Sequence, residues 1–206
     1  MSSVVVLISG RGSNLQALID AGIPVSAVIS NVAGAGGLAI AARHGIPTLV
    51  VKHGDFPTRE AFEVVLAAEI DRFTPKLVVH AGFMRIVTSG YVEHYAGRML
   101  NVHPSLLPSF TGLHTHERAL AAGAKVHGCT VHFVTLELDA GPIVIQAAIP
   151  VLAQDTVETL SARVLRQEHL VYPRAIKWFL DGKLVIENGR VSVKGGDAQL
   201  VFDDRP

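Results

Sequence analysis

Two side chains of catalytic type lie close together in the segment MLNVHPSLLP, residues 99–108. Its apolar start predicts a buried strand, which must end near Pro104 because proline cannot donate to a sheet ladder. Asn101 and His103 are two positions apart, so they point to the same side of an extended chain. An amide beside an imidazole supplies an oxyanion donor and a proton carrier at a strand end, where open α/β sheets bind ligands. A buried, hydrogen-bonded histidine beside a turn residue explains the same sequence.

Asp139 is the acidic residue that we pair with His103. A carboxylate beside an imidazole fixes the tautomer of the ring and favours its protonated form. Asp139 lies in a predicted turn, residues 137–142, and 36 positions separate it from His103. The alternative is a turn aspartate that is hydrogen-bonded to its own backbone.

A glycine turn, GRGSN at residues 10–14, directly follows a predicted strand and precedes a predicted helix. This layout points backbone N–H groups at a phosphate, and Ser13 and Asn14 add side-chain donors. The alternative is a tight turn in which Ser13 caps the helix. Because the turn comes directly after the strand, we favour an anion site.

Dinucleotide, ATP and zinc sites are not expected. The pattern Gly10-x-Gly12-x-x-Leu15 lacks the third glycine of the dinucleotide fingerprint and the acid that should follow about twenty residues later. A second stretch, Gly34-x-Gly36-x-x-Ala39, also fits the glycine spacing of the fingerprint, but we attribute this match to chance in a Gly/Ala-rich segment. The lysine of a Walker A motif, which an ATP site would need, is absent. His114 and His116 lack the helical spacing and the partner ligands of a zinc site.

Strands and helices alternate along the first half of the chain. Strands are predicted over residues 4–9, 25–30, 47–51, 76–80 and 99–102. Helices are predicted over residues 15–21, 34–44, 55–73 and 89–95, the third with Pro57 in its first turn. This alternation predicts parallel βαβ units. The loop over residues 81–87 suits a pocket for a flat aromatic ligand, and equally suits ordinary core with Arg85 reaching solvent.

The second half of the chain predicts a mixed arrangement. A helix is expected at 116–122, and strands at 125–136 and 143–151 should pair antiparallel. A long helix over 155–180 should be capped by Asp155 and interrupted near Tyr172 and Pro173. A small hairpin follows at 184–193, and the last ten residues look frayed. The expected fold is α/β, with a mostly parallel central sheet, an antiparallel C-terminal part and helices on both faces.

Composition limits the possible partners and locations. Of the 206 residues, 49% are hydrophobic and 17% charged, which suits one domain with a large core. Lys plus Arg equals Asp plus Glu at 18 each, so no nucleic-acid partner is expected. The apolar runs are too short to span a bilayer, and the N-terminus lacks a signal peptide's basic region. Cys129 is the single cysteine, so no internal disulfide can form. We expect a cytoplasmic protein.

Five segments, in order along residues 4–178, carry a resemblance to a known family. They are SGRGSNLQAL, AGFMRIV, NVHPSLLPSFTGLHTHERAL, GCTVHFVTLELDAGPIVIQ and QEHLVYP. Together they resemble the phosphoribosylglycinamide formyltransferases, the folate-dependent enzymes of purine synthesis. The resemblance implies a Rossmann-like formyltransferase fold: one domain over residues 1–206, with a phosphate-binding half at 1–100 and a catalytic, folate-contacting half at 101–206.

The resemblance also implies roles for individual residues. The catalytic residues are Asn101, His103 and Asp139. The substrate phosphate is held at Gly12, Ser13, Asn14 and Leu15. The glycinamide ribonucleotide is contacted at Leu165, Arg166, Gln167 and Glu168, so a pocket-facing role for Glu168 replaces the solvated one that its helix suggests. Folate is contacted at Arg59, Met84, Arg85, Ile86, Val87, Asn101, Thr135, Leu136, Glu137, Leu138 and Asp139.

The implied reaction moves the formyl group of 10-formyltetrahydrofolate, the co-substrate, to the amine of glycinamide ribonucleotide. It yields formylglycinamide ribonucleotide and tetrahydrofolate in de novo purine biosynthesis, without a metal. Asn101 and protonated His103 would stabilise the charged formyl oxygen, and Asp139 would support His103. The partners are these small molecules, and a homodimer is left open. Two loop residues depart from the family pattern: Thr111 replaces a frequent proline, and Arg11 a smaller polar residue.

Three other functions compete with this expectation. A formyltetrahydrofolate hydrolase would share the catalytic residues and use water as acceptor, but the phosphate turn and the lack of an added regulatory domain count against it. A transformylase acting on charged tRNA would need a further C-terminal domain and a basic surface. A binding module would keep the glycine turn without needing Asn101, His103 and Asp139 together.

Overall fold

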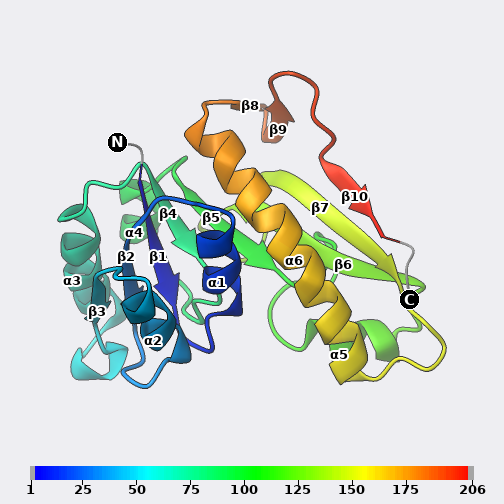
Figure 1. Cartoon of the computed structure of the whole chain (residues 1–206), viewed down its shortest axis with the longest axis horizontal. Coiled ribbons are helices and arrows are strands. Elements are labelled where there is room, and N and C mark those ends of the chain that lie inside the picture. Colours follow the sequence, from blue (N-terminus) through cyan, green and yellow to red (C-terminus); the bar gives the residue numbers. More distant parts are fainter. Residues whose placement is uncertain (1–2, 204–206) are drawn as a thin grey trace. The chain divides into compact units, whose positions relative to one another are not determined.

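The computed structural model describes residues 3–203 and has two compact units, Met1–Asn101 and Val102–Pro206. Figure 1 shows the helices and strands of each unit in sequence colours. The expectation of a single domain stays a prediction. No helix within the described residues is long and apolar enough to cross a bilayer.

The first unit is built on parallel strands. They are β1 (Val4–Ile8), β2 (Val25–Ser30), β3 (Thr48–Val50), β4 (Leu77–His80) and β5 (Met99–His103), whose last two residues belong to the second unit. Their order is β5-β4-β1-β2-β3, and each neighbouring pair is parallel. All five residues of β1 are buried. A continuous apolar run of this kind is what a strand covered on both faces requires, which is why the sequence predicted it correctly.

The helices of the first unit pack in two pairs. They are α1 (Ser13–Asp20), α2 (Gly36–Arg43), α3 (Arg59–Asp71) and α4 (Ser89–His94), with a short 3-10 helix η1 at His53–Asp55. α1 contacts α2, and α3 contacts α4 (Figure 1). The expected place of Pro57 in the first turn of α3 is wrong. Thr58 is the N-cap, and its hydroxyl oxygen accepts the Ala61 N–H at 3.1 Å. A hydroxyl satisfies an otherwise unpaired N–H there, which proline cannot do.

The second unit contains an antiparallel pair with one added strand. β6 (Val126–Phe133) pairs antiparallel with β7 (Ile143–Pro150), as expected. β10 (Leu200–Phe202) pairs parallel with β7, so the expectation of a frayed end is wrong for these residues. Residues 204–206 lie outside the described range. β8 (Leu184–Glu187) and β9 (Arg190–Val193) form the predicted hairpin, with positive φ at Asn188 and Gly189.

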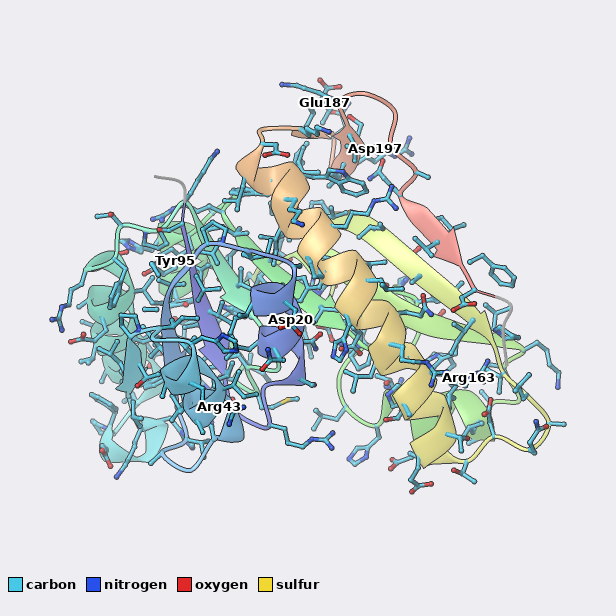
Figure 2. All side chains as sticks on the ribbon, in the orientation of Figure 1. Asp20, Arg43, Tyr95, Arg163, Glu187 and Asp197 are labelled. Carbon is cyan, nitrogen blue, oxygen red and sulfur yellow. The ribbon has the colours of Figure 1, made fainter. Side chains whose placement is uncertain are left out.

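Two helices complete the second unit, α5 (Thr115–Ala121) and α6 (Val157–Leu180). The cap of α6 is Thr156, one residue after the expected Asp155. The Asp155 carboxylate instead binds Arg163 at 2.8 Å, and both side chains are buried. Figure 2 labels Arg163 on α6. The predicted interruption is also wrong, because α6 is continuous through Pro173, which is buried with Tyr172. Packing outweighs the lost helical hydrogen bond there.

The fold class is the expected one. The architecture is α/β, with a mostly parallel central sheet, an antiparallel part and helices around it. This arrangement ends β5 at His103, so that a catalytic type of residue lies at the carboxyl end of a buried strand.

Candidate active site

His103 lies between two acceptors. Its side chain is almost fully buried at the end of β5. Nε2 is 3.0 Å from the carbonyl oxygen of Phe110, and Nδ1 is 3.4 Å from Oδ2 of Asp139. Because both oxygens only accept, the doubly protonated ring is the form that donates on both sides. The structure therefore brings His103 and Asp139 together, which the sequence alone did not do.

The Asp139 carboxylate is held by a hydrogen bond from a residue that is distant in the sequence. Its Oδ2 accepts the N–H of Gly112 at 2.8 Å, and only 8% of its side chain is exposed. Its backbone has a φ of 54°, in the left-handed region that aspartate tolerates better than most residues. The alternative of a turn aspartate bonded to its own backbone does not describe these contacts. Asp139 instead joins the β6–β7 turn to the loop that carries Gly112.

The β6–β7 turn depends on Gly141. A Cβ at this position would lie 1.8 Å from the carbonyl oxygen of Phe133, so only glycine fits. The N–H of Phe133 donates to the carbonyl of Pro142 at 3.0 Å and closes the turn. This close backbone contact positions Asp139 at the end of β6.

His132 is the second imidazole beside Asp139. Its Nε2 is 3.8 Å from Oδ1 of Asp139, while its Nδ1 lies 2.9 Å from the carbonyl of Phe133. Burial is the main cause that lowers the pKa of His132, and the charge of His103 adds to it. His132 is thus neutral at neutral pH.

His116 and His127 form a histidine pair in the same unit. Nδ1 of His116 is 3.1 Å from Nε2 of His127, and the rings meet edge to face. The ring of Phe110 also packs edge-on against His127. Burial lowers the pKa of His127 to about 4, and His116 and His103 contribute in the same direction. No group of three or more histidine, cysteine or acidic residues within residues 3–203 could hold a metal ion.

Asn101 shares β5 with His103. It is half-buried and lies two residues earlier on the strand. That the two side chains leave the same side of β5 stays a prediction. β5 passes from the first unit into the second between these residues.

The glycine turn leads into α1, as expected, and the anion site assigned to it stays a prediction. Gly12 is the N-cap of α1 with a φ of 84°, and Ser13 is the first helical residue. The alternative in which Ser13 caps the helix is therefore wrong, since the cap makes no side-chain hydrogen bond. Ser13 and Asn14 are half-buried and Leu15 is buried. The second glycine stretch has a packing reason: a Cβ on Gly12 would lie 2.5 Å from Cα of Gly37.

The four α6 residues implied by the resemblance fall into two classes. Gln167 and Glu168 are buried, with 3% and 7% of their surface exposed, whereas Leu165 is half-buried and Arg166 exposed. Nε2 of Gln167 donates to Oδ2 of Asp203 at 2.8 Å. Glu168 therefore does not lie on a solvated helix face, as its position alone suggested.

The residues implied for folate lie in three places. Arg59 is the exposed first residue of α3. The loop after β4 exposes Met84 and Ile86, with Arg85 and Val87 half-buried. The turn before Asp139 has Thr135 half-buried and exposes Leu136, Glu137 and Leu138.

Two backbone groups of the site escaped sequence reasoning. The carbonyl of Phe110 and the N–H of Gly112 contact His103 and Asp139. Backbone atoms have no residue-type signature, although the loop TGLHTH already belonged to the resemblance. The signal for them was the glycine in that loop, because Gly112 has a φ of 76°.

Comparison with known proteins decides the family. Residues 2–176 match the family model described as formyl transferase. The phosphoribosylglycinamide formyltransferase of Escherichia coli (strain K12) is 50% identical over 199 residues, covering 94% of each chain. The chain belongs to the phosphoribosylglycinamide formyltransferase family.

Other members agree in sequence and in structure. The solved phosphoribosylglycinamide formyltransferase of Coxiella burnetii superposes with a TM-score of 0.92 at 49% identity, covering 97% of this chain and 99% of that one. The trifunctional purine biosynthetic protein adenosine-3 of Bos taurus is 48% identical over 195 residues. That match covers 91% of this chain but only 19% of the bovine protein.

Two departures of this formyltransferase from the family pattern can now be located. The carbonyl of Thr111 accepts a hydrogen bond from Arg118 at 2.5 Å, which ties the loop to α5. Arg11 is exposed in the glycine turn, and its carbonyl oxygen would lie 3.3 Å from a Cβ at Gly36. Thr111 lies between Phe110 and Gly112, whose backbone groups contact His103 and Asp139.

Proposed function

We propose that the chain transfers the formyl group of 10-formyltetrahydrofolate to the amine of glycinamide ribonucleotide. The products are formylglycinamide ribonucleotide and tetrahydrofolate, and the reaction is a step of de novo purine biosynthesis. The observation that carries this proposal is His103 held between the Phe110 carbonyl and Asp139 in a member of this family.

The proposed mechanism uses three side chains. The deprotonated amine attacks the formyl carbon, and negative charge collects on the formyl oxygen. Asn101 and protonated His103 donate hydrogen bonds to that oxygen. For His103, we assign the donor to Nε2–H, the group that faces the Phe110 carbonyl in the structure. Loss of such a donor typically costs about 3 kcal/mol in the barrier. Asp139 supports the charged ring and helps a proton reach the leaving folate nitrogen.

The remaining site residues divide between the two substrates. Backbone N–H groups near Gly12 and the start of α1 suit the phosphate, because a helix N-terminus favours an anion. Ser13, Asn14 and Leu15 belong to that turn. The buried polar residues Gln167 and Glu168, with Leu165 and Arg166, are assigned to the rest of glycinamide ribonucleotide.

The folate side is assigned to apolar and polar loop residues. Exposed Met84 and Ile86 suit the flat pterin ring system. The other folate residues are Arg59, Arg85, Val87, Asn101, Thr135, Leu136, Glu137, Leu138 and Asp139. The reaction as proposed needs no metal. A homodimer and a cytoplasmic location stay predictions.

One assay tests the proposal against its alternatives. The protein is mixed with 10-formyltetrahydrofolate, with and without glycinamide ribonucleotide, and tetrahydrofolate release is followed. Release that requires the amine supports formyl transfer, release without it would mean hydrolysis, and no release would leave a binding protein. The variant His103→Gln serves as a control for contaminating activity, since it should lose the release.

A further inference from the structure

The loop over residues 82–88, between β4 and α4, presents apolar side chains on a fixed backbone. Met84 and Ile86 are 69% and 54% exposed. An exposed loop with such side chains would lose much conformational freedom on binding a ligand. Here, however, hydrogen bonds hold the backbone near each end.

Ser9 forms the first anchor. It directly follows β1, and its N–H donates to the carbonyl of Gly82 at 3.1 Å. Its hydroxyl oxygen accepts the N–H of Met84 at 2.8 Å and donates its own proton to Oδ1 of Asn31 at 2.6 Å. One residue thus binds the loop through both its backbone and its side chain.

Asn31 orients that hydroxyl. It follows β2, and only 5% of its surface is exposed. Its Nδ2 lies 3.2 Å from Nδ1 of His53, so the amide nitrogen is directed to η1 and the amide oxygen to Ser9. Because the Ser9 proton goes to Asn31, a lone pair of the oxygen is directed to the Met84 N–H.

Glu63 forms the second anchor. This residue of α3 is 5% exposed, and its carboxylate accepts the N–H of Thr88 at 3.0 Å. The hydroxyl of Thr88 donates to the same carboxylate. Thr88 is the N-cap of α4, so the far end of the loop is fixed to α3.

We propose that Ser9 is a positioning residue for the formyl-folate side of the site. It acts through Met84: by fixing this backbone in advance, it removes the ordering cost that folate binding would otherwise meet. The inference rests on the proposed function, which places residues 84–87 against the folate. Ser9 begins the segment SGRGSNLQAL of the resemblance, but no role was assigned to it there.

The test uses three variants in the full chain. Ser9→Ala removes the hydroxyl, and Ser9→Thr keeps it. Ser26→Ala is the matched control, since the Ser26 hydroxyl on β2 donates to the carbonyl of Val4 at 3.1 Å and does not touch the loop. For each variant, amide hydrogen exchange of Met84 is measured by NMR. The KM for each substrate and kcat are measured in the formyl-transfer assay.

We expect Ser9→Ala to speed exchange of the Met84 amide at least about fivefold, the effect of losing one hydrogen bond of ordinary strength. The KM for 10-formyltetrahydrofolate should rise about fivefold. The KM for glycinamide ribonucleotide and kcat should stay within about twofold of wild type. Ser9→Thr should restore both values, and Ser26→Ala should change neither.

Other results would overturn the proposal. Equal rises in both KM values, or faster exchange with an unchanged folate KM, would show that the anchor is structural only. If Ser9→Ala does not fold, Asn31→Ala removes the acceptor of the hydroxyl and must give the same split. If the wild type transfers no formyl group, the proposed function fails separately. Tetrahydrofolate affinity measured by calorimetry then replaces KM, and equal affinity of wild type and Ser9→Ala rejects the inference.

Discussion

Two buried histidines in the second unit, His103 and His127, differ in what faces the ring. His103 has a carboxylate on one side and a carbonyl on the other, whereas His127 faces the imidazole of His116. Phe110 touches both pairs, since its carbonyl accepts from His103 and its ring packs on His127. Burial is similar, with 6% of His103 and 1% of His127 exposed. The two rings therefore differ in their partners much more than in their burial.

The comparison also shows how the two pairs affect one another. The charge of His103 lowers the pKa of His116, His127 and His132, and for each of the three burial is the larger cause. The surrounding imidazoles are therefore neutral at neutral pH.

The largest expected effect comes from removing the carboxylate. Asp139→Asn keeps an oxygen that can accept the Gly112 N–H, so the loop contact can survive while the charge is lost. We expect kcat to fall about 100- to 1000-fold, with KM for both substrates within about threefold. Steady-state kinetics measure this, with the melting temperature as a control for folding. Near-normal turnover would remove Asp139 from the mechanism.

An intermediate effect is expected from the pH dependence of the unfolding free energy, through His127 of the His116–His127 pair. The folded-state pKa of His127 is about 4, below the ordinary 6.5, so the unfolded chain binds this proton more readily. The stabilising contribution is complete above pH 6.5 and is lost as pH falls toward 4.

The variant His127→Gln sharpens this prediction. Between pH 6.5 and pH 4 the unfolding free energy of the variant, which lacks the titrating ring, should fall less than that of the wild type. The difference between the two falls should be about 1–2 kcal/mol after solvent screening. Urea titrations at several pH values measure the difference, and turnover at pH 7.5 should stay within about threefold of wild type. Parallel pH profiles of the two proteins would contradict the assigned role of His127.

The smallest effect is expected at an exposed pair. Nδ1 of His114 is 2.7 Å from a carboxylate oxygen of Glu117, closer than His103 is to Asp139, but their side chains are 69% and 53% exposed. Exposed ion pairs contribute about 0.2–1 kcal/mol. His114→Gln should therefore change the unfolding free energy by less than about 1 kcal/mol in urea titrations. A larger loss would mean that proximity outweighs burial in this protein.

Regular patterns in the sequence predicted most of the fold. The continuous apolar runs of β1, β2 and β4 fit parallel strands covered on both faces, and all three were predicted to within two residues. β10 was missed because its three residues expose Leu200 and Phe202 and depend on pairing with β7. The caps at Thr58 and Thr156 were missed because neighbouring residues, Pro57 and Asp155, are equally good start signals.

The candidate site was predicted unevenly. Asn101 and His103 follow from two-residue spacing on one strand. The pairing of His103 with Asp139 stayed open beside the alternative of a turn aspartate, since no local rule joins residues 36 positions apart. His132 was not assigned a role, because period-2 alternation does not say which buried residues reach a neighbouring turn. Ser9 lies in a segment of the resemblance, but its hydrogen bond to the Met84 backbone, 75 residues away, has no signature in the sequence.

The contact between Gly12 and Gly37 limits how this protein can evolve or be redesigned. A side chain at Gly12 would meet the backbone of Gly37, and one at Gly37 would lie 2.5 Å from Cδ1 of Ile8. The glycine turn and the start of α2 thus pack with no room for a side chain at either glycine. Random libraries directed at residues 10–14 should therefore recover variation at exposed Arg11 and little at Gly12.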